Sequence, residues 1–181
     1  MKRRIIIFFI VAAMALPCLV FAQKERNQDV WEPFRFFVGR WEGQGEGKAG
    51  ISKGKQEWQF VLRGKFLQVK NETSFEPQGK NLEGEIHEDF GFFSFDQIRR
   101  KHIFRQFHVE GFVNQYVLES MGDDNKTFIF VSEQIENIPL GWKARLSYKI
   151  LNENEFQQTF DLQAPGKEFE CYSKGILKRK K

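Results

Sequence analysis

Residues 142–151, with the sequence WKARLSYKIL, show the pattern that decides the fold. Apolar and polar side chains alternate along this stretch, which places Ala144, Leu146, Tyr148 and Ile150 on one face. A period of two residues is typical of a β-strand with one buried face, because successive side chains point to opposite sides of a sheet. The stretch therefore predicts a strand that contributes every second side chain to the interior of the protein.

Similar runs follow one another along most of the chain, and Gly, Asn, Asp and Pro residues separate them. The strands expected from these runs cover residues 41–47, 58–62, 66–75, 85–95, 101–109, 112–119, 127–135, 142–151, 156–162 and 169–177. About ten short strands with connections of hairpin length predict an antiparallel meander. A meander of this length avoids exposed edges either by closing on itself or by splitting into two sheets. We predict the more economical of the two, an all-β fold with an antiparallel up-and-down barrel.

One stretch, residues 29–38, has helical spacing instead. Trp31, Phe34 and Val38 recur within it at intervals of three and four residues, and Asp29 is placed to act as the N-cap. The sequence thus predicts a short N-terminal helix ahead of the strands.

The N-terminus has the three parts of a secretory signal peptide. Basic residues stand at positions 2–4, an apolar run covers residues 5–20, and Ala22 precedes an abruptly polar segment. The apolar run is short for a membrane span, so we expect no stable span. We expect a signal peptide over residues 1–22, one barrel domain over residues 23–181 and a secreted or periplasmic protein. A lipid anchor on Cys18 is the alternative.

The net charge of +4 and the isoelectric point near 9.0 arise at the two ends of the chain. Removal of residues 1–22 leaves a net charge of +1, and residues 178–181 are all basic. A nucleic-acid-binding protein spreads Lys and Arg over one face of its domain. The charge distribution therefore removes nucleic acid from the expected partners.

Motifs for catalysis and for metal binding are missing from the sequence, which has neither a Gly-x-Ser-x-Gly elbow nor a His-Glu-x-x-His motif. Residues 86–89 offer three ligand-type side chains, but His87 and Asp89 point away from Glu88 in a strand. Cys171 is the one cysteine after residue 22, and we expect it to be a small buried side chain. We therefore expect no catalytic residue and no metal site, and the sequence leaves open whether the protein is an enzyme.

The interior of a ten-stranded barrel is wide, so we expect a cavity that holds a small apolar ligand. The chain has 21 Phe residues, which suits an aromatic pocket. His102, Gln106 and His108 share one face of their strand, but the periodicity does not tell which face points inward. The residues expected to bind the ligand are Trp41, Trp58, Phe60, His102, His108, Tyr116, Phe130, Tyr148 and Phe160.

Blocks of this sequence resemble the nitrobindin family. Residues 34–47, FRFFVGRWEGQGEG, are similar to its opening, where a short helix leads into a Gly-x-Trp strand and a Gly-rich stretch. Residues 87–93, HEDFGFF, resemble the family's His-Glu-x-x-Gly-aromatic strand, and residues 175–179, GILKR, resemble its closing strand.

The Gly-x-Trp element, Gly39-Arg40-Trp41, is by itself similar to the signature of lipocalins and other calycins. The resemblance implies a ten-stranded calycin barrel, like that of fatty-acid-binding proteins. It also implies that Gly39, Trp41 and Arg179 are structural, with Arg179 packed over Trp41.

Nitrobindins bind haem through a His on the last strand, and a peroxynitrite isomerase activity is ascribed to them. This chain has no His beyond His108, and Tyr172 stands roughly where that His would fall. The departure favours an exported carrier or binding protein for a small apolar ligand, without a cofactor. A haem-binding protein or a haem-dependent nitrobindin-like isomerase is the alternative, with Tyr172, His102 or His108 as the axial ligand. A structural or interaction protein whose own Phe side chains fill the barrel is a third possibility. The sequence leaves the ligand and the oligomeric state open.

Overall fold

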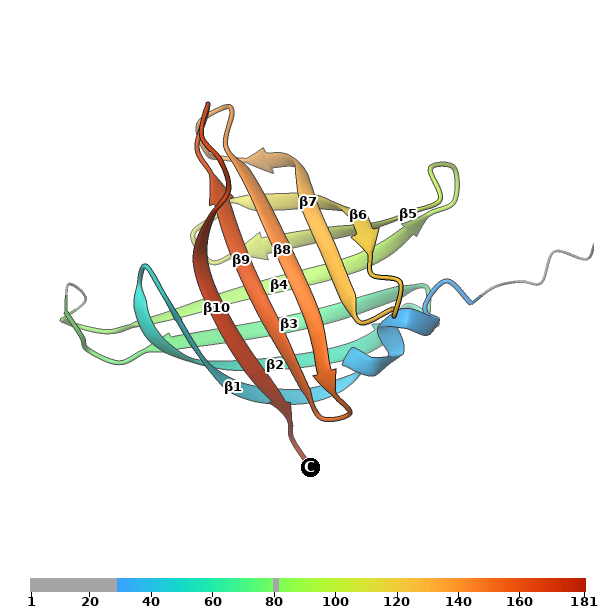
Figure 1. Cartoon of the computed structure of the whole chain (residues 1–181), viewed down its shortest axis with the longest axis horizontal. Helices are drawn as coiled ribbons and strands as arrows, with labels where there is room; N and C mark the ends of the chain where they lie inside the picture. The colour runs from blue at the N-terminus through green and yellow to red at the C-terminus, as the bar shows by residue number, and fades with distance from the viewer. Residues whose placement is uncertain (1–28, 80–81) are drawn as a thin grey trace, which may run out of the picture.

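The computed structural model describes residues 29–79 and 82–181, so the predicted signal peptide and Cys18 lie outside the described residues. The described part of the chain forms one short 3₁₀ helix followed by ten strands (Figure 1). In order along the chain they are η1 (Glu32–Phe37), β1 (Gly39–Gly47), β2 (Gly50–Val61), β3 (Phe66–Phe75), β4 (Glu85–Asp96), β5 (Lys101–His108), β6 (Val113–Met121), β7 (Thr127–Glu136), β8 (Lys143–Asn152), β9 (Glu155–Gln163) and β10 (Glu170–Arg179).

The strands form one closed antiparallel barrel in which each strand pairs with its neighbours in sequence. β1 pairs with β2 on one side and with β10 on the other, which closes the barrel. The predicted all-β, ten-stranded up-and-down barrel is thus confirmed. β2 begins eight residues before the predicted start, because its first half places Ser52, Gly54 and Gln56 inward, where the apolar alternation is absent.

The helix η1 closes one end of the barrel (Figure 1). It is shorter than predicted, and Trp31 is its N-cap residue in place of Asp29. The Asp29 carboxylate still accepts a hydrogen bond of 3.0 Å from the Trp31 amide. Phe34 and Phe37 lie on the same side of this helix, which has three residues per turn, and each is only 1% exposed. The helix therefore inserts two rings into the barrel.

Aromatic rings fill the end of the barrel that η1 closes. Phe37 stacks on Trp58 with 5.1 Å between ring centroids, and Trp58 stacks on Phe93 at 5.3 Å. The stack continues to Phe104 at 4.0 Å and from there to Tyr116 at 5.7 Å. Each such pair contributes roughly 0.5–1.5 kcal/mol beyond the burial of apolar area. This end of the barrel, called the packed end below, is a core made of the protein's own side chains.

Glycines allow β1 and β10 to approach each other closely where the barrel closes. A Cβ atom on Gly43 would lie 2.0 Å from the carbonyl oxygen of Ile176, and one on Gly47 would lie 2.2 Å from that of Tyr172. Gly39, at the start of β1, has a φ of 124°, a conformation that favours glycine. The Gly-rich stretch therefore permits the pairing of the first and last strands.

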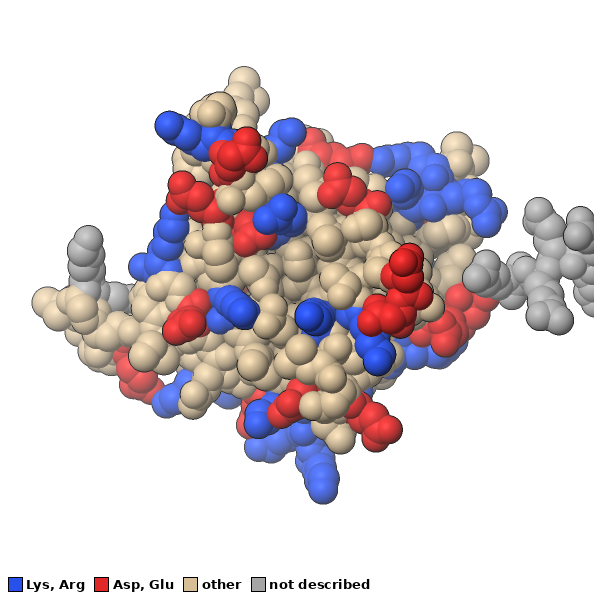
Figure 2. Space-filling view, in the orientation of Figure 1, with Lys and Arg blue, Asp and Glu red and all other residues tan. Residues whose placement is uncertain are grey.

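Charges of both signs are interspersed over the outer surface that Figure 2 shows. Many of them form exposed ion pairs, such as Lys55 with Glu72 at 2.7 Å between β2 and β3. Pairs of this kind contribute little to stability. Within residues 29–79 and 82–181, no helix has the length and apolar character that crossing a membrane requires.

Candidate functional site

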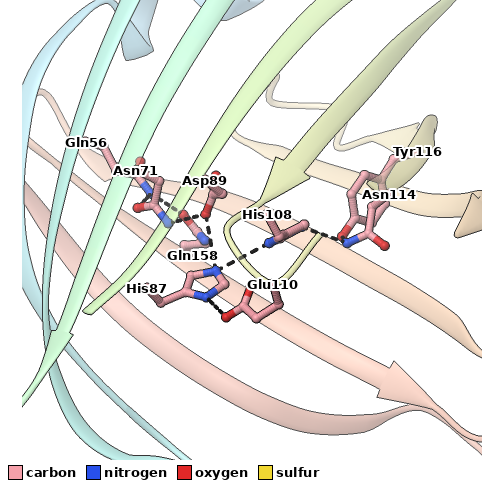
Figure 3. Close-up of polar contacts among 9 residues, drawn as sticks. All are labelled: Gln56, Asn71, His87, Asp89, His108, Glu110, Asn114, Tyr116 and Gln158. Carbon is pink, nitrogen blue, oxygen red and sulfur yellow. Dashed lines mark hydrogen bonds and ion pairs between the residues drawn. The ribbon is translucent and has the colours of Figure 1, made fainter. Parts of the chain in front are cut away.

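The end of the barrel opposite η1 holds an open cavity of about 550 Å³. Its walls carry apolar and mainly aromatic side chains from several strands and loops, namely Phe75, Phe112, Ile135, Trp142, Leu146 and Phe160. Polar side chains line its inner part or bond to those that do, and Figure 3 shows their contacts. They are called the polar floor below and are those of Gln56, Asn71, His87, Asp89, His108, Glu110, Asn114 and Gln158. An apolar cavity with a few converging polar groups is the usual form of a small-molecule site.

One half of the polar floor is a chain of amide hydrogen bonds that crosses the barrel. The Trp58 indole donates to the Gln56 side-chain oxygen at 2.9 Å, which ties the floor to the aromatic stack. The Gln56 amide nitrogen donates to Gln158 at 2.7 Å and to Asn71 at 3.2 Å. The Asn71 amide in turn donates to the Asp89 carboxylate at 2.7 Å. These bonds fix the side chains of β2, β3, β4 and β9 relative to one another.

The other half of the floor contains two imidazoles. His87 Nε2 and His108 Nδ1 are 3.3 Å apart, and His87 Nδ1 contacts the Glu110 carboxylate (Figure 3). His108 Nε2 lies 3.1 Å from the Asn114 amide nitrogen, which also donates to the Tyr116 hydroxyl at 2.9 Å. Because a carboxylate only accepts, His87 Nδ1 carries a proton in this contact, and whenever the ring is uncharged its Nε2 atom offers a lone pair.

Asp89 is a buried carboxylate whose hydrogen bonds are incomplete. Its side chain is 2% exposed, and its Oδ1 atom has no hydrogen-bond partner. Burial raises the pKa of this carboxyl, although the Asn71 and Gln106 amides and the nearby His87 ring act in the opposite direction. An incompletely bonded buried carboxylate is costly, so this position is suited to a ligand that supplies a donor or a positive charge.

His108 is held neutral by its surroundings. Burial, helped by the neighbouring His87, lowers the pKa of His108 to about 4, although Glu110 acts in the opposite direction. The ring also stacks on Phe112 with 4.0 Å between centroids. At neutral pH this imidazole is therefore uncharged and can donate from one ring nitrogen while accepting at the other.

The carboxylic side chains, and no Lys or Arg, supply the charged groups among the described residues that line the cavity. The ionisable carboxylic side chains among the lining residues are those of Glu46, Glu85, Asp89 and Glu110, and no Lys or Arg is among the described residues that line it. Acidic groups at both the rim and the floor make the cavity a poor place for an anion.

The structure divides the residues predicted to bind a ligand between the two ends of the barrel. His108 and Phe160 line the cavity, as does Tyr172, the residue predicted as a haem ligand. The other predicted residues do not line it and lie in or against the packed end, namely Trp41, Trp58, Phe60, His102, Tyr116, Phe130 and Tyr148. All of them belong to the inward pattern, but position along each strand decides which end a side chain reaches.

The face of β5 that carries the histidines points inward. Phe104 and Gln106 are buried on it, His108 reaches the cavity, and His102 lies at the other end of the strand. There His102 Nε2 is 2.8 Å from the carbonyl oxygen of Val30, so this ring belongs to the packed end. Cys171, which was expected to be buried, is exposed, because the adjacent Tyr172 takes the cavity side of β10.

Sequence reasoning missed most of the polar floor. It placed His87 and Asp89 on the side of β4 opposite Glu88, but it expected no metal site there. The structure pairs Asp89 with His108 across β4 and β5, which brings a second imidazole to the first. Three ligand-type side chains, those of His87, Asp89 and His108, thus offer atoms within 4.8 Å of one another. A pairing of the two predicted strands in register would have revealed this cluster.

Comparison with solved structures shows that other proteins share this barrel fold. The crystal structure of Rv2717c from M. tuberculosis is similar with a TM-score of 0.59 and 16% identity, covering 83% of this chain and 97% of that chain. The S-type phycobiliprotein lyase CPES from Guillardia theta is similar with a TM-score of 0.51 and 14% identity, covering 84% and 93%. At these identities the likeness concerns the fold alone. No protein-family model matches the chain, and a search of curated proteins finds no match.

Proposed function

We propose that this protein is an exported binding protein that holds one small, mainly apolar molecule in the open end of its barrel. The observation that carries the proposal is the division of one barrel into a packed end and a cavity of about 550 Å³ with apolar walls and a polar floor. A ligand in this cavity would bury its apolar part against the walls and turn its polar end toward Asp89 and its neighbours. Export rests on the signal-peptide pattern of residues 1–22.

The charges of the cavity define the class of ligand further. Glu46, Asp89 and Glu110 line it, and no Lys or Arg is among the described lining residues. A fatty-acid carboxylate would meet these groups without a counter-ion, whereas an alcohol or an amine can donate to Asp89 Oδ1, which has no partner. The preferred ligand is therefore a neutral or positively charged apolar molecule that carries a hydrogen-bond donor.

Haem, the alternative cofactor, does not suit the residues of this cavity. Its two propionates are anionic, and the carboxylic side chains that line the cavity would repel them. Of the predicted axial ligands, His102 lies in the packed end, and both ring nitrogens of His108 are turned toward His87 and Asn114. Tyr172 is the one candidate that faces the cavity without such contacts among the described hydrogen bonds. Because the carboxylic side chains would still repel the propionates, the proposed function does not include haem.

A displacement assay with matched ligands tests the proposed function. The uncharged dye Nile red is bound to the protein in the presence of a chelator, and then dodecanol, dodecylamine or dodecanoate is added. These three competitors share one chain length and differ in the head group. We expect the alcohol and the amine to displace the dye, and dodecanoate to be at least about tenfold weaker, since a like-charge contact costs more than 1.4 kcal/mol.

Matched variants of β3 locate the binding to the cavity. Thr73 lines the cavity, whereas the next residue, Ser74, is on the other face of the strand. Thr73→Trp should abolish dye uptake by filling the cavity, and Ser74→Trp should leave it unchanged. Equal uptake by both variants, or no uptake by the wild-type protein, would exclude ligand binding in the barrel.

Haem titration of the same protein tests the alternative. We expect no saturable Soret shift. A shift that Tyr172→Phe removes would instead make haem the ligand of this cavity.

A further inference from the structure

We propose a second kind of ligand for this protein, a divalent first-row transition metal ion of the zinc type, held on the polar floor by His87 Nε2, Asp89 and His108 Nδ1. The three side chains come from adjacent strands. His87 and Asp89 are two residues apart on the inward face of β4, and Asp89 is the direct partner of His108 on β5. The barrel framework therefore fixes all three positions. This site does not depend on the proposed binding of an apolar molecule.

The ligand atoms of the three residues lie within 4.8 Å of one another, which is close to the spacing of a metal site. His87 Nε2 is 3.3 Å from His108 Nδ1 and 3.7 Å from Asp89 Oδ2. Tetrahedral ligands that lie about 2.0–2.1 Å from a zinc ion are roughly 3.3–3.4 Å from one another. Side-chain rotations that shorten the longer of these distances would place all three ligand atoms around one ion.

The unpartnered oxygen of Asp89 is an independent observation that points to a cation. This carboxylate is 2% exposed, Asn71 bonds only its Oδ2 atom, and Oδ1 has no partner. Buried carboxylates are normally paired with a positive group or coordinate a metal. No Lys or Arg among the described residues lines this cavity, and the described ion-pair partner of Asp89 is the His87 ring at 3.7 Å. When no bound molecule donates to Asp89, a metal ion held by both side chains would complete the environment of this carboxylate.

The contacts of the ring nitrogens that face away from the proposed ion also suit metal binding. A metal-bound imidazole usually donates its other N–H to a carboxylate or a carbonyl oxygen. His87 Nδ1 already contacts the Glu110 carboxylate, which leaves Nε2 free for the ion. This arrangement fixes the tautomer that metal binding requires.

Asn114 can provide the same support for His108. Its amide nitrogen lies 3.1 Å from His108 Nε2, and its Oδ1 atom is buried without a partner. Rotation of the amide by 180° exchanges these two atoms. The oxygen would then accept from His108 Nε2–H and from the Tyr116 hydroxyl, and His108 Nδ1 would offer its lone pair to the ion.

The donor set determines the class of metal. Two imidazoles and one carboxylate suit zinc and its first-row neighbours, whereas calcium and magnesium require mainly oxygen ligands. All three residues line the cavity, so a fourth coordination position would open into it. A site with three protein ligands and one open position can accept water or an atom of a bound molecule.

Metal titration of the untagged protein, expressed from its full sequence, tests this proposal. After treatment with a chelator and its removal, zinc chloride is titrated by calorimetry and cobalt chloride by visible absorption. We expect one ion per chain and cobalt bands typical of four or five ligands. His87→Gln and His108→Gln should each weaken zinc binding at least about 100-fold, and Glu110→Gln by roughly 10- to 100-fold.

Two control variants separate this site from other zinc ligands. His102→Gln removes an imidazole in the packed end, and Cys171→Ser removes the exposed thiol, so neither should change the affinity. If His87→Gln or His108→Gln does not fold, imidazole ¹⁵N spectra of the wild-type protein test the site instead. Addition of zinc should shift the signals of His87 and His108 and leave the signal of His102 unchanged. Absence of saturable binding, or binding that shifts neither of these two rings, would overturn the proposal.

Discussion

The guanidinium group of Arg179 lies over the indole ring of Trp41, with 4.1 Å between Cζ and the ring centroid. It also donates to the carbonyl oxygens of Phe36 at 2.6 Å and Val38 at 2.8 Å. The Trp41 indole in turn donates to the carbonyl oxygen of Phe37 at 2.7 Å. Together the two side chains bind the free carbonyl groups at the end of η1 and connect the helix to the first and last strands.

Loss of this connection should destabilise the barrel. We expect Arg179→Ala to lower the free energy of unfolding by about 2 kcal/mol, because it removes a cation–π contact and two charge-assisted hydrogen bonds. Arg179→Lys should recover only part of the loss, since an ammonium lacks the planar fork of donors. Urea unfolding measures the free energy of unfolding of both variants. Lys178→Ala, at an exposed neighbouring position, is the control and should change the stability by less than about 0.5 kcal/mol.

The glycines of β1 and β2 offer a matched pair of substitutions. Gly43 and Gly54 are direct partners, but a Cβ on Gly43 would lie 2.0 Å from the Ile176 carbonyl oxygen, whereas one on Gly54 meets nothing within 4 Å. We expect Gly43→Ala to cost more than about 2 kcal/mol and Gly54→Ala to be neutral or slightly stabilising. Thermal unfolding compares the melting temperatures of the two variants with that of the wild-type protein. Equal melting temperatures would show that β10 can move away from β1 at little cost.

Stability should depend on pH through His108. Its pKa is lowered from 6.5 to about 4 by burial and by the charge of His87, while Glu110 opposes the shift. Between pH 6.5 and pH 4 the unfolded chain therefore binds a proton that the folded protein does not, so stability falls as the pH falls through this window. From pH 7 to pH 4.5 this residue should account for about 2 kcal/mol of lost stability.

Urea unfolding of the wild-type protein and of His108→Gln, at both pH values and with a chelator present, isolates this contribution. Other groups that titrate, including Asp89, His87 and Glu110, remain in both proteins. The wild-type protein should lose more stability than the variant between pH 7 and pH 4.5. Parallel losses would mean that His108 takes up its proton in the folded protein.

Tryptophan fluorescence should report on the cavity through one residue. Trp142 lines the cavity and is 38% exposed, whereas Trp31, Trp41 and Trp58 are buried at the packed end. We expect bound Nile red to quench mainly Trp142, because energy transfer declines with distance. Trp142→Phe should therefore remove most of the quenching while dye uptake, followed by dye emission, persists. Unchanged quenching in this variant would place the dye near the packed end.

The strand pattern could be predicted from the sequence, but the division of the interior could not. Alternation in β8 placed Leu146 and Tyr148 on the same inward face, and both are buried. Only Leu146 lines the cavity, because Tyr148 lies further along the strand, against Phe37 of the helix. A period of two residues defines a face and carries no information about depth within a barrel.

The candidate site depends on contacts between residues that are distant in sequence. Asp89 meets Asn71 and His108 only through strand pairing, and Gln56 meets Gln158 across the interior. Polar residues at inward positions gave the sharper signal for a pocket, but an isolated strand can turn either face toward the core. The Phe residues indicated an aromatic interior without telling which of them line a pocket, and many of them fill the packed end.

The sequence by itself determined the all-β class and the number of strands, because alternation and turn residues act locally along the chain. The closing of the barrel could be predicted because a meander of this length would otherwise leave exposed edges. The tertiary structure decided where the cavity lies and which groups line it. Strand register brought His87, Asp89 and His108 together, and the insertion of Phe34 and Phe37 filled one end of the barrel. Both effects arise from packing between distant segments, which local pattern does not encode.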